Sequence, residues 1–100
     1  MYRGTTPTHT FDMPFDTSII SKVRIVYAQD SVPIIVKETE DCTFAGTVIS
    51  VKLSQVDTLA LDCSKFVNIQ IRVLTMGNDA LTSDVIRKSV GECLDDEVLE

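Results

Sequence analysis

The sequence lacks tryptophan and contains a single histidine, four glycines and three prolines among its 100 residues. So little glycine and proline argues against a collagen-like or low-complexity chain. The longest uncharged apolar stretches are far shorter than the roughly 20 residues that a membrane-spanning helix needs, so we expect no membrane association. Hydrophobic residues make up 44% of the chain and charged residues 24%, which is typical of a folded domain. We expect one domain over residues 1–100.

The acidic residues are concentrated at the C-terminus. The formal net charge is -6, yet residues 1–91 carry nine basic and ten acidic side chains and are nearly neutral. The remaining five acids lie in residues 92–100, which we expect to form a solvated acidic tail. The basic residues are scattered along the chain, with Lys22–Arg24 and Arg87–Lys88 as the only close pairs. This distribution argues against nucleic acid as a partner, because phosphate contacts need clustered Lys and Arg.

Three cysteines, Cys42, Cys63 and Cys93, cannot all pair within one chain. No apolar signal-peptide segment follows Met1. Both observations fit reduced thiols in a protein made in a cytosol, although one disulfide plus one free thiol would give the same cysteine count. Residues 1–7 show no strong pattern and are expected to form a short N-terminal arm.

Apolar and polar residues alternate in much of the chain. In residues 67–73 every odd position is apolar and every even position is polar, which predicts a half-buried strand of an antiparallel sheet. Residues 80–90 fit a strand or a helix, and we favour a strand because Gly77, Asn78 and Asp79 before it are typical of a hairpin turn. Strands are predicted at residues 8–13, 22–27, 34–38, 49–53, 58–62, 67–73 and 80–90.

The spacing of these segments predicts the fold class. Seven strands at intervals of about ten residues favour an all-β fold, an immunoglobulin-like antiparallel β-sandwich. Ser54 and Asp57 match a helix-capping pattern, so one short helical turn is expected there. A small open barrel would produce the same strands, and no tryptophan or inter-sheet cysteine pair decides between the two folds.

Few residues are candidates for chemistry. His9 is the only imidazole, and no G-x-S-x-G nucleophile motif accompanies it. His9 and the three cysteines would supply the atoms of a zinc site, but they lack the close spacing of such ligands. The acidic clusters Glu38–Asp41 and Asp95–Glu97 lack the order of a calcium-binding loop. We therefore expect no catalytic, cofactor-binding or metal site and no enzymatic activity.

Strand edges and outward-facing apolar residues remain as candidates for binding. A sandwich leaves unpaired backbone groups at its edges, which can pair with another chain. Val26 and Leu74 each lie on the otherwise polar face of a predicted strand. A single exposed apolar residue is ordinary, whereas several on one face would indicate an assembly surface.

The sequence also resembles a known group of proteins. The segments that carry the likeness are residues 3–11, 14–17, 26–30, 37–42, 51–55, 57–58, 68–73 and 93–99. They resemble small uncharacterised proteins encoded in prophage regions of Gram-positive bacteria. The resemblance implies a phage structural or assembly protein of the tail or baseplate region, present in the host cytoplasm during assembly and then in the virion. It implies no catalytic or binding residue.

These observations together favour a non-enzymatic protein that acts through contacts with copies of itself or with other virion proteins. The first alternative is a β-sandwich module that binds a cell-surface ligand such as a glycan. The second is a small enzyme or metalloprotein that uses His9 and the cysteines.

Overall fold

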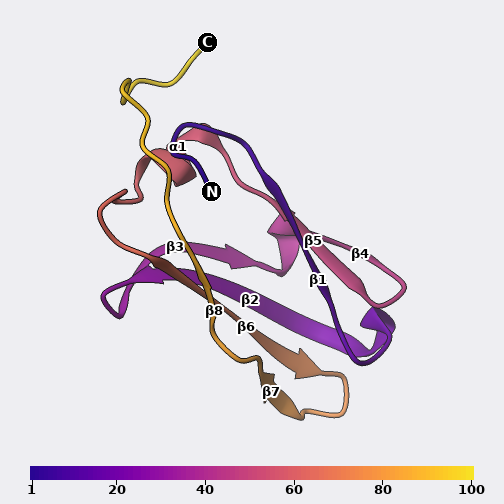
Figure 1. Cartoon of the computed structure of the whole chain (residues 1–100). Coiled ribbons are helices and arrows are strands. Elements are labelled where there is room, and N and C mark those ends of the chain that lie inside the picture. Colours follow the sequence, from indigo (N-terminus) through magenta and orange to yellow (C-terminus); the bar gives the residue numbers. More distant parts are fainter.

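The structure, a computed structural model, describes residues 1–100 and is built from antiparallel strands (Figure 1). The strands are β1 (Thr8–Asp12), β2 (Ile20–Gln29), β3 (Val32–Glu38), β4 (Cys42–Ala45), β5 (Val48–Lys52), β6 (Val67–Thr75), β7 (Ala80–Thr82) and β8 (Ile86–Lys88). One α-helix, α1 (Gln55–Leu59), and two short 3-10 turns, η1 (Thr17–Ile19) and η2 (Thr39–Asp41), complete the fold.

The strands form two sheets. One has three strands in the order β1-β5-β4, and the other has β3, β2 and β6 side by side, with β7 and β8 both pairing with β6. Every strand pairing is antiparallel. The expected antiparallel β-sandwich with one short helical turn is confirmed.

The core lies between the sheets and follows the predicted alternation. Val23, Ile25 and Tyr27 of β2 are buried, as are Ile49 and Val51 of β5. Each buried residue alternates with one that points away from the core, because successive side chains of a strand lie on opposite faces. The same rule buries Val67, Ile69, Ile71 and Val73 in β6.

Two predictions about individual elements are wrong. Residues 58–62 do not form a strand, because the Ser54–Asp57 capping box starts α1, which includes Thr58. Residues 42–45, which lie between the predicted strands at 34–38 and 49–53, form β4 and pair with β5. Their weak alternation hid this strand, since Thr43 and Phe44 are both exposed.

The predicted strand at residues 80–90 is interrupted. Ser83 forms two hydrogen bonds with the backbone of Ile71. Its N–H donates to the Ile71 carbonyl, and its side-chain oxygen accepts from the Ile71 N–H. The Ser83 hydroxyl thus takes the place of a backbone acceptor, and the chain leaves the sheet between β7 and β8.

The N-terminal arm lies against the C-terminal segment. The Met1 carbonyl accepts from the Gly91 N–H, and the Arg3 N–H donates to the Gly91 carbonyl. The Tyr2 ring sits so close to Gly91 that any Cβ there would collide with it. Beyond Gly91 the tail runs past α1, where Arg3 pairs with Asp96 and Gln55 exchanges two hydrogen bonds with Leu99. No helix of the structure has the length and apolar character needed to cross a membrane.

Candidate interaction surface

His9 links the two sheets. It lies on β1, and its Nδ1 is 2.6 Å from the hydroxyl oxygen of Tyr27 on β2. Burial raises the pKa of Tyr27 far above its usual value, so the hydroxyl that hydrogen-bonds with Nδ1 keeps its proton. Burial also lowers the pKa of His9, and the positive charges of the Met1 amino group and Lys88 lower it further. These effects favour the neutral imidazole, and its hydrogen bond with Tyr27 connects the two sheets.

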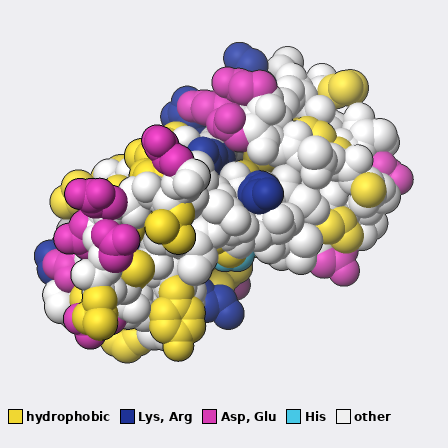
Figure 2. Space-filling model, turned by 90° about the horizontal axis from the view of Figure 1, so that it is seen from above, with side chains coloured by type: hydrophobic (Ala, Val, Ile, Leu, Met, Phe, Trp, Pro, Cys, Tyr) yellow, Lys and Arg dark blue, Asp and Glu magenta, His cyan; other side chains and the backbone are white.

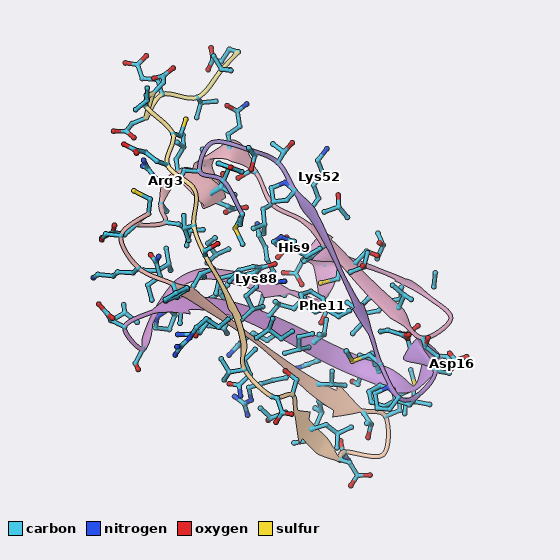
Figure 3. All side chains as sticks on the ribbon, viewed as in Figure 1. Arg3, His9, Phe11, Asp16, Lys52 and Lys88 are labelled. Carbon is cyan, nitrogen blue, oxygen red and sulfur yellow. The ribbon has the colours of Figure 1, made fainter.

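The hollow beside His9 lies between β1 and β8 (Figure 3). It has a volume of about 490 Å³, and the labelled side chains of His9 and Lys88 lie near each other along it. Figure 2 shows the single histidine recessed at the waist of the molecule. No acidic or cysteine side chain lines this hollow. The structure thus brings His9 together with a tyrosine and a lysine, and not with a nucleophile–carboxylate pair.

The three cysteines do not form a shared site. All are free: Cys63 is exposed, and Cys42 and Cys93 are half-buried. The Cys42 thiol donates to the Glu38 carbonyl, and burial raises its pKa, which lowers its reactivity. No group of three histidine, cysteine or acidic side chains is placed to hold a metal ion.

The outer face of the five-stranded sheet gathers apolar residues. We use "outer face" for the side chains that point away from the core, which are Lys22, Arg24, Val26, Ala28, Val36, Glu38, Asn68, Gln70, Arg72, Leu74, Ala80, Thr82 and Arg87. The strand register sets Val26 directly opposite Val36, and Leu74 directly opposite Ala80. Val36 is 45% exposed. The two residues noted in the sequence, Val26 and Leu74, therefore share one face with further apolar neighbours.

The same face carries a basic groove. We use this name for the hollow of about 260 Å³ that lies over the start of β2 and the end of β6. Its charged lining consists of Lys22, Arg24 and Arg72, together with Glu38. Arg24 forms an ion pair with Glu38, with 3.1 Å between Nη2 and Oε1, whereas Lys22 and Arg72 form none. Three cations against one anion leave the groove positively charged.

Only part of this surface can be predicted from the sequence. Lys22 and Arg24 are visible as a close pair in the sequence, but Arg72 lies 48 positions beyond Arg24. Only the pairing of β2 with β6 brings Arg72 beside them. Val36 was hidden for a similar reason, since the run Ile34-Ile35-Val36 does not reveal which of its residues faces outward.

Comparison with known proteins concerns the fold alone. Two antiparallel sheets packed around one core make the chain a β-sandwich. No protein-family model and no curated protein matches the sequence. Among solved structures, the chain is similar to the V domain of amphioxus IgVJ-C2, with 12% sequence identity and a TM-score of 0.42. The similarity covers 91% of this chain and 95% of that one.

Proposed function

We propose that this protein is a non-enzymatic structural or assembly protein, and that it acts through protein–protein contacts made by the outer face of its five-stranded sheet. The observation that carries the proposal is the pair Val26 and Val36 on the outer face, with the half-buried Leu74 on the same face beyond Arg24 and Arg72. Outer faces of antiparallel sheets are normally polar, and several apolar residues together mark a contact surface.

The total surface supports the same proposal. A folded monomer of 11.1 kDa ordinarily exposes about 5,700 Å². This chain exposes 6248 Å², and only 18 of its residues are buried. The isolated chain therefore leaves more surface in water than its mass requires, and association would remove part of it.

The resemblance to prophage-encoded proteins gives the proposal its setting, a phage tail or baseplate. Such particles repeat one small protein many times, and repeated contacts of this kind close into symmetric rings. The partners are then copies of this chain or neighbouring virion proteins.

The test introduces a negative charge between Val26 and Val36, which lie opposite each other on the outer face. We expect the unmodified protein to self-associate or to bind neighbouring tail proteins in size-exclusion chromatography with light scattering. Val36→Glu puts a carboxylate where Val26 and Val36 meet and should abolish that association, because a buried charge at an interface is costly.

Thr43→Glu is the matched control for this test. Thr43 is exposed on β4, in the other sheet, and its substitution should leave association unchanged. A protein that stays monomeric and binds no tail protein would refute the proposal. So would a Val36→Glu variant that associates as well as the Thr43→Glu control.

A second candidate function is a module that binds a cell-surface glycan. The observation that favours it is a hollow of about 350 Å³ between β1 and β7, lined by Asp12 and Phe15 among other residues. The Asp12 carboxylate accepts a hydrogen bond from the Thr47 hydroxyl and keeps further acceptor positions for a sugar, and an aromatic ring such as that of Phe15 can stack on a sugar. A glycan array should then give a signal that Asp12→Ala removes, and an array without signal would exclude this function.

A further inference from the structure

The basic groove contains a charge conflict that the fold alone does not explain. Arg24 and Arg72 lie directly opposite each other on neighbouring strands, with both side chains on the outer face. Like charges in this position destabilise a sheet, and Glu38 neutralises only Arg24. A local conflict of this kind indicates a functional demand, which here is a site for an anion.

The groove also offers apolar contact. Leu74 and Ala80, which lie opposite each other on β6 and β7, line it next to the cations. A simple inorganic anion would contact the three cations but not the apolar side chains of the groove. A ligand that matches the whole groove carries negative charges and apolar side chains together.

The C-terminal tail has this chemistry. Residues 94–100 contain four acids and three apolar residues, namely Leu94, Val98 and Leu99. Leu94 is 95% exposed and Leu99 is 76% exposed. Figure 2 shows acidic and hydrophobic side chains side by side at the left end of the molecule.

Within one molecule the tail and the groove lie at opposite ends. The tail is held beside α1 through Arg3 and Gln55, while the groove covers the start of β2 and the end of β6. Figure 1 shows the C-terminus at the top and the end of β6 near β7 at the bottom, in a molecule with a longest dimension of 46 Å. A tail held in this place meets a groove only on another copy.

We propose that the acidic C-terminal tail of one copy binds the basic groove of the next, so that the protein assembles head to tail. This inference rests on the proposed assembly function and names its partner, a second copy of this chain. A head-to-tail contact joins two different surfaces, and its repetition produces a ring or a filament. The tail contacts Arg3 and Gln55 through Asp96 and the backbone of Leu99, so its other side chains stay exposed and can meet the groove of the next copy while the tail remains in place.

The experiment uses the whole chain and two variants with complementary defects. The groove variant is Lys22→Gln with Arg72→Gln, which removes two positive charges and keeps the Arg24–Glu38 ion pair. The tail variant is Asp95→Asn with Glu97→Gln and Glu100→Gln, which removes three negative charges and keeps the Arg3–Asp96 ion pair. The control is Lys52→Gln with Lys88→Gln, two exposed lysines outside the groove and without ion pairs.

Sedimentation velocity should show oligomers for the unmodified protein and for the control, and salt should weaken them. Each defective variant alone should associate about tenfold or more weakly. An equal mixture of the two variants should form dimers and nothing larger, because only one intact tail and one intact groove remain in each pair. The tail substitutions lie on exposed residues outside the core, so this variant stays folded whatever happens to the groove variant.

The outcomes separate the two proposals. Oligomers that persist unchanged in both variants would contradict the proposed contact between the C-terminal tail and the basic groove, but they would agree with the proposed assembly function. A tail that binds the groove of its own molecule would give compact monomers and would also contradict the proposed contact. If the unmodified protein neither self-associates nor binds tail proteins, both proposals are wrong.

Discussion

His9 forms a hydrogen bond between the two sheets. In a Ser–His–Asp triad the imidazole contacts a nucleophile and a carboxylate, whereas Nδ1 of His9 lies 2.6 Å from the Tyr27 hydroxyl oxygen. Alternation in the predicted strand at residues 8–13 puts His9 and Phe11 on one face, but it does not reveal that β2 places Tyr27 opposite His9 in the other sheet. Contacts between sheets depend on how the whole chain packs, and they leave no local sequence pattern.

The first prediction concerns the titration of His9. Its pKa is lowered in the folded protein, so the folded state prefers neutral imidazole. The stability that this provides is present above 6.5, the ordinary pKa of histidine, and is lost as the pH falls from there through the folded-state pKa. NMR titration of the imidazole should give a midpoint below 6.5, and unfolding in urea should be easier at pH 5 than at pH 7.

The variant His9→Gln isolates this effect. Glutamine keeps an acceptor near Tyr27 but does not titrate, so the part of the pH dependence that His9 causes should disappear. A midpoint at or above 6.5 in the native protein, or an identical pH dependence in the variant, would contradict the assignment.

At the scale of elements, strict alternation was a reliable guide and short weak segments were not. Strands β2, β5 and β6 repeat apolar residues at every second position, and the buried side chains lie at these positions. Residues 58–62 also contain such a repeat, but the capping box at Ser54 and Asp57 places Thr58 inside a helix. Here a local hydrogen-bond pattern outweighed strand propensity, and the same four-residue pattern correctly located the helix.

The second prediction tests that capping box. The Ser54 hydroxyl oxygen accepts from the Asp57 N–H at 3.1 Å, and the Asp57 carboxylate accepts from the Ser54 N–H at 2.9 Å. Ser54→Ala removes the first bond and should lower the free energy of unfolding by about 1 kcal/mol. Ser54→Thr keeps a hydroxyl and should lose much less in the same urea titration. Equal losses in the two variants would show that the cap does not stabilise α1.

The third prediction concerns the acid side of the stability profile. Burial of Asp57 opposes its ionisation, but hydrogen bonds from Lys37 and Ser54 outweigh burial and lower the pKa of the carboxyl. The resulting stability is present above the ordinary aspartate value of 3.8 and is lost as the pH falls through the lower folded-state pKa. Asp57→Asn should therefore flatten the loss of stability below pH 4 in thermal melts, whereas an unchanged acid profile would contradict this role.

At the scale of the whole molecule, the chain is long and thin. Its dimensions are 46 × 29 × 16 Å, so a large part of its surface belongs to the two outward sheet faces. One face carries Val26 and Val36 beside a basic groove, and the acidic tail lies at the far end. The two-sheet fold could be predicted from periodicity, whereas this surface depends on strand register and could not.

The central claim is that the outer face of the five-stranded sheet is a protein contact surface, and an NMR dilution series tests it most directly. Amide signals of the ¹⁵N-labelled protein report which residues change environment as dilution dissociates the oligomers. The claim predicts changes at Val26, Val36, Arg72 and Leu74, with little change along β4 and β5. Spectra that are independent of concentration and of added tail proteins, or changes confined to the three-stranded sheet, would contradict it.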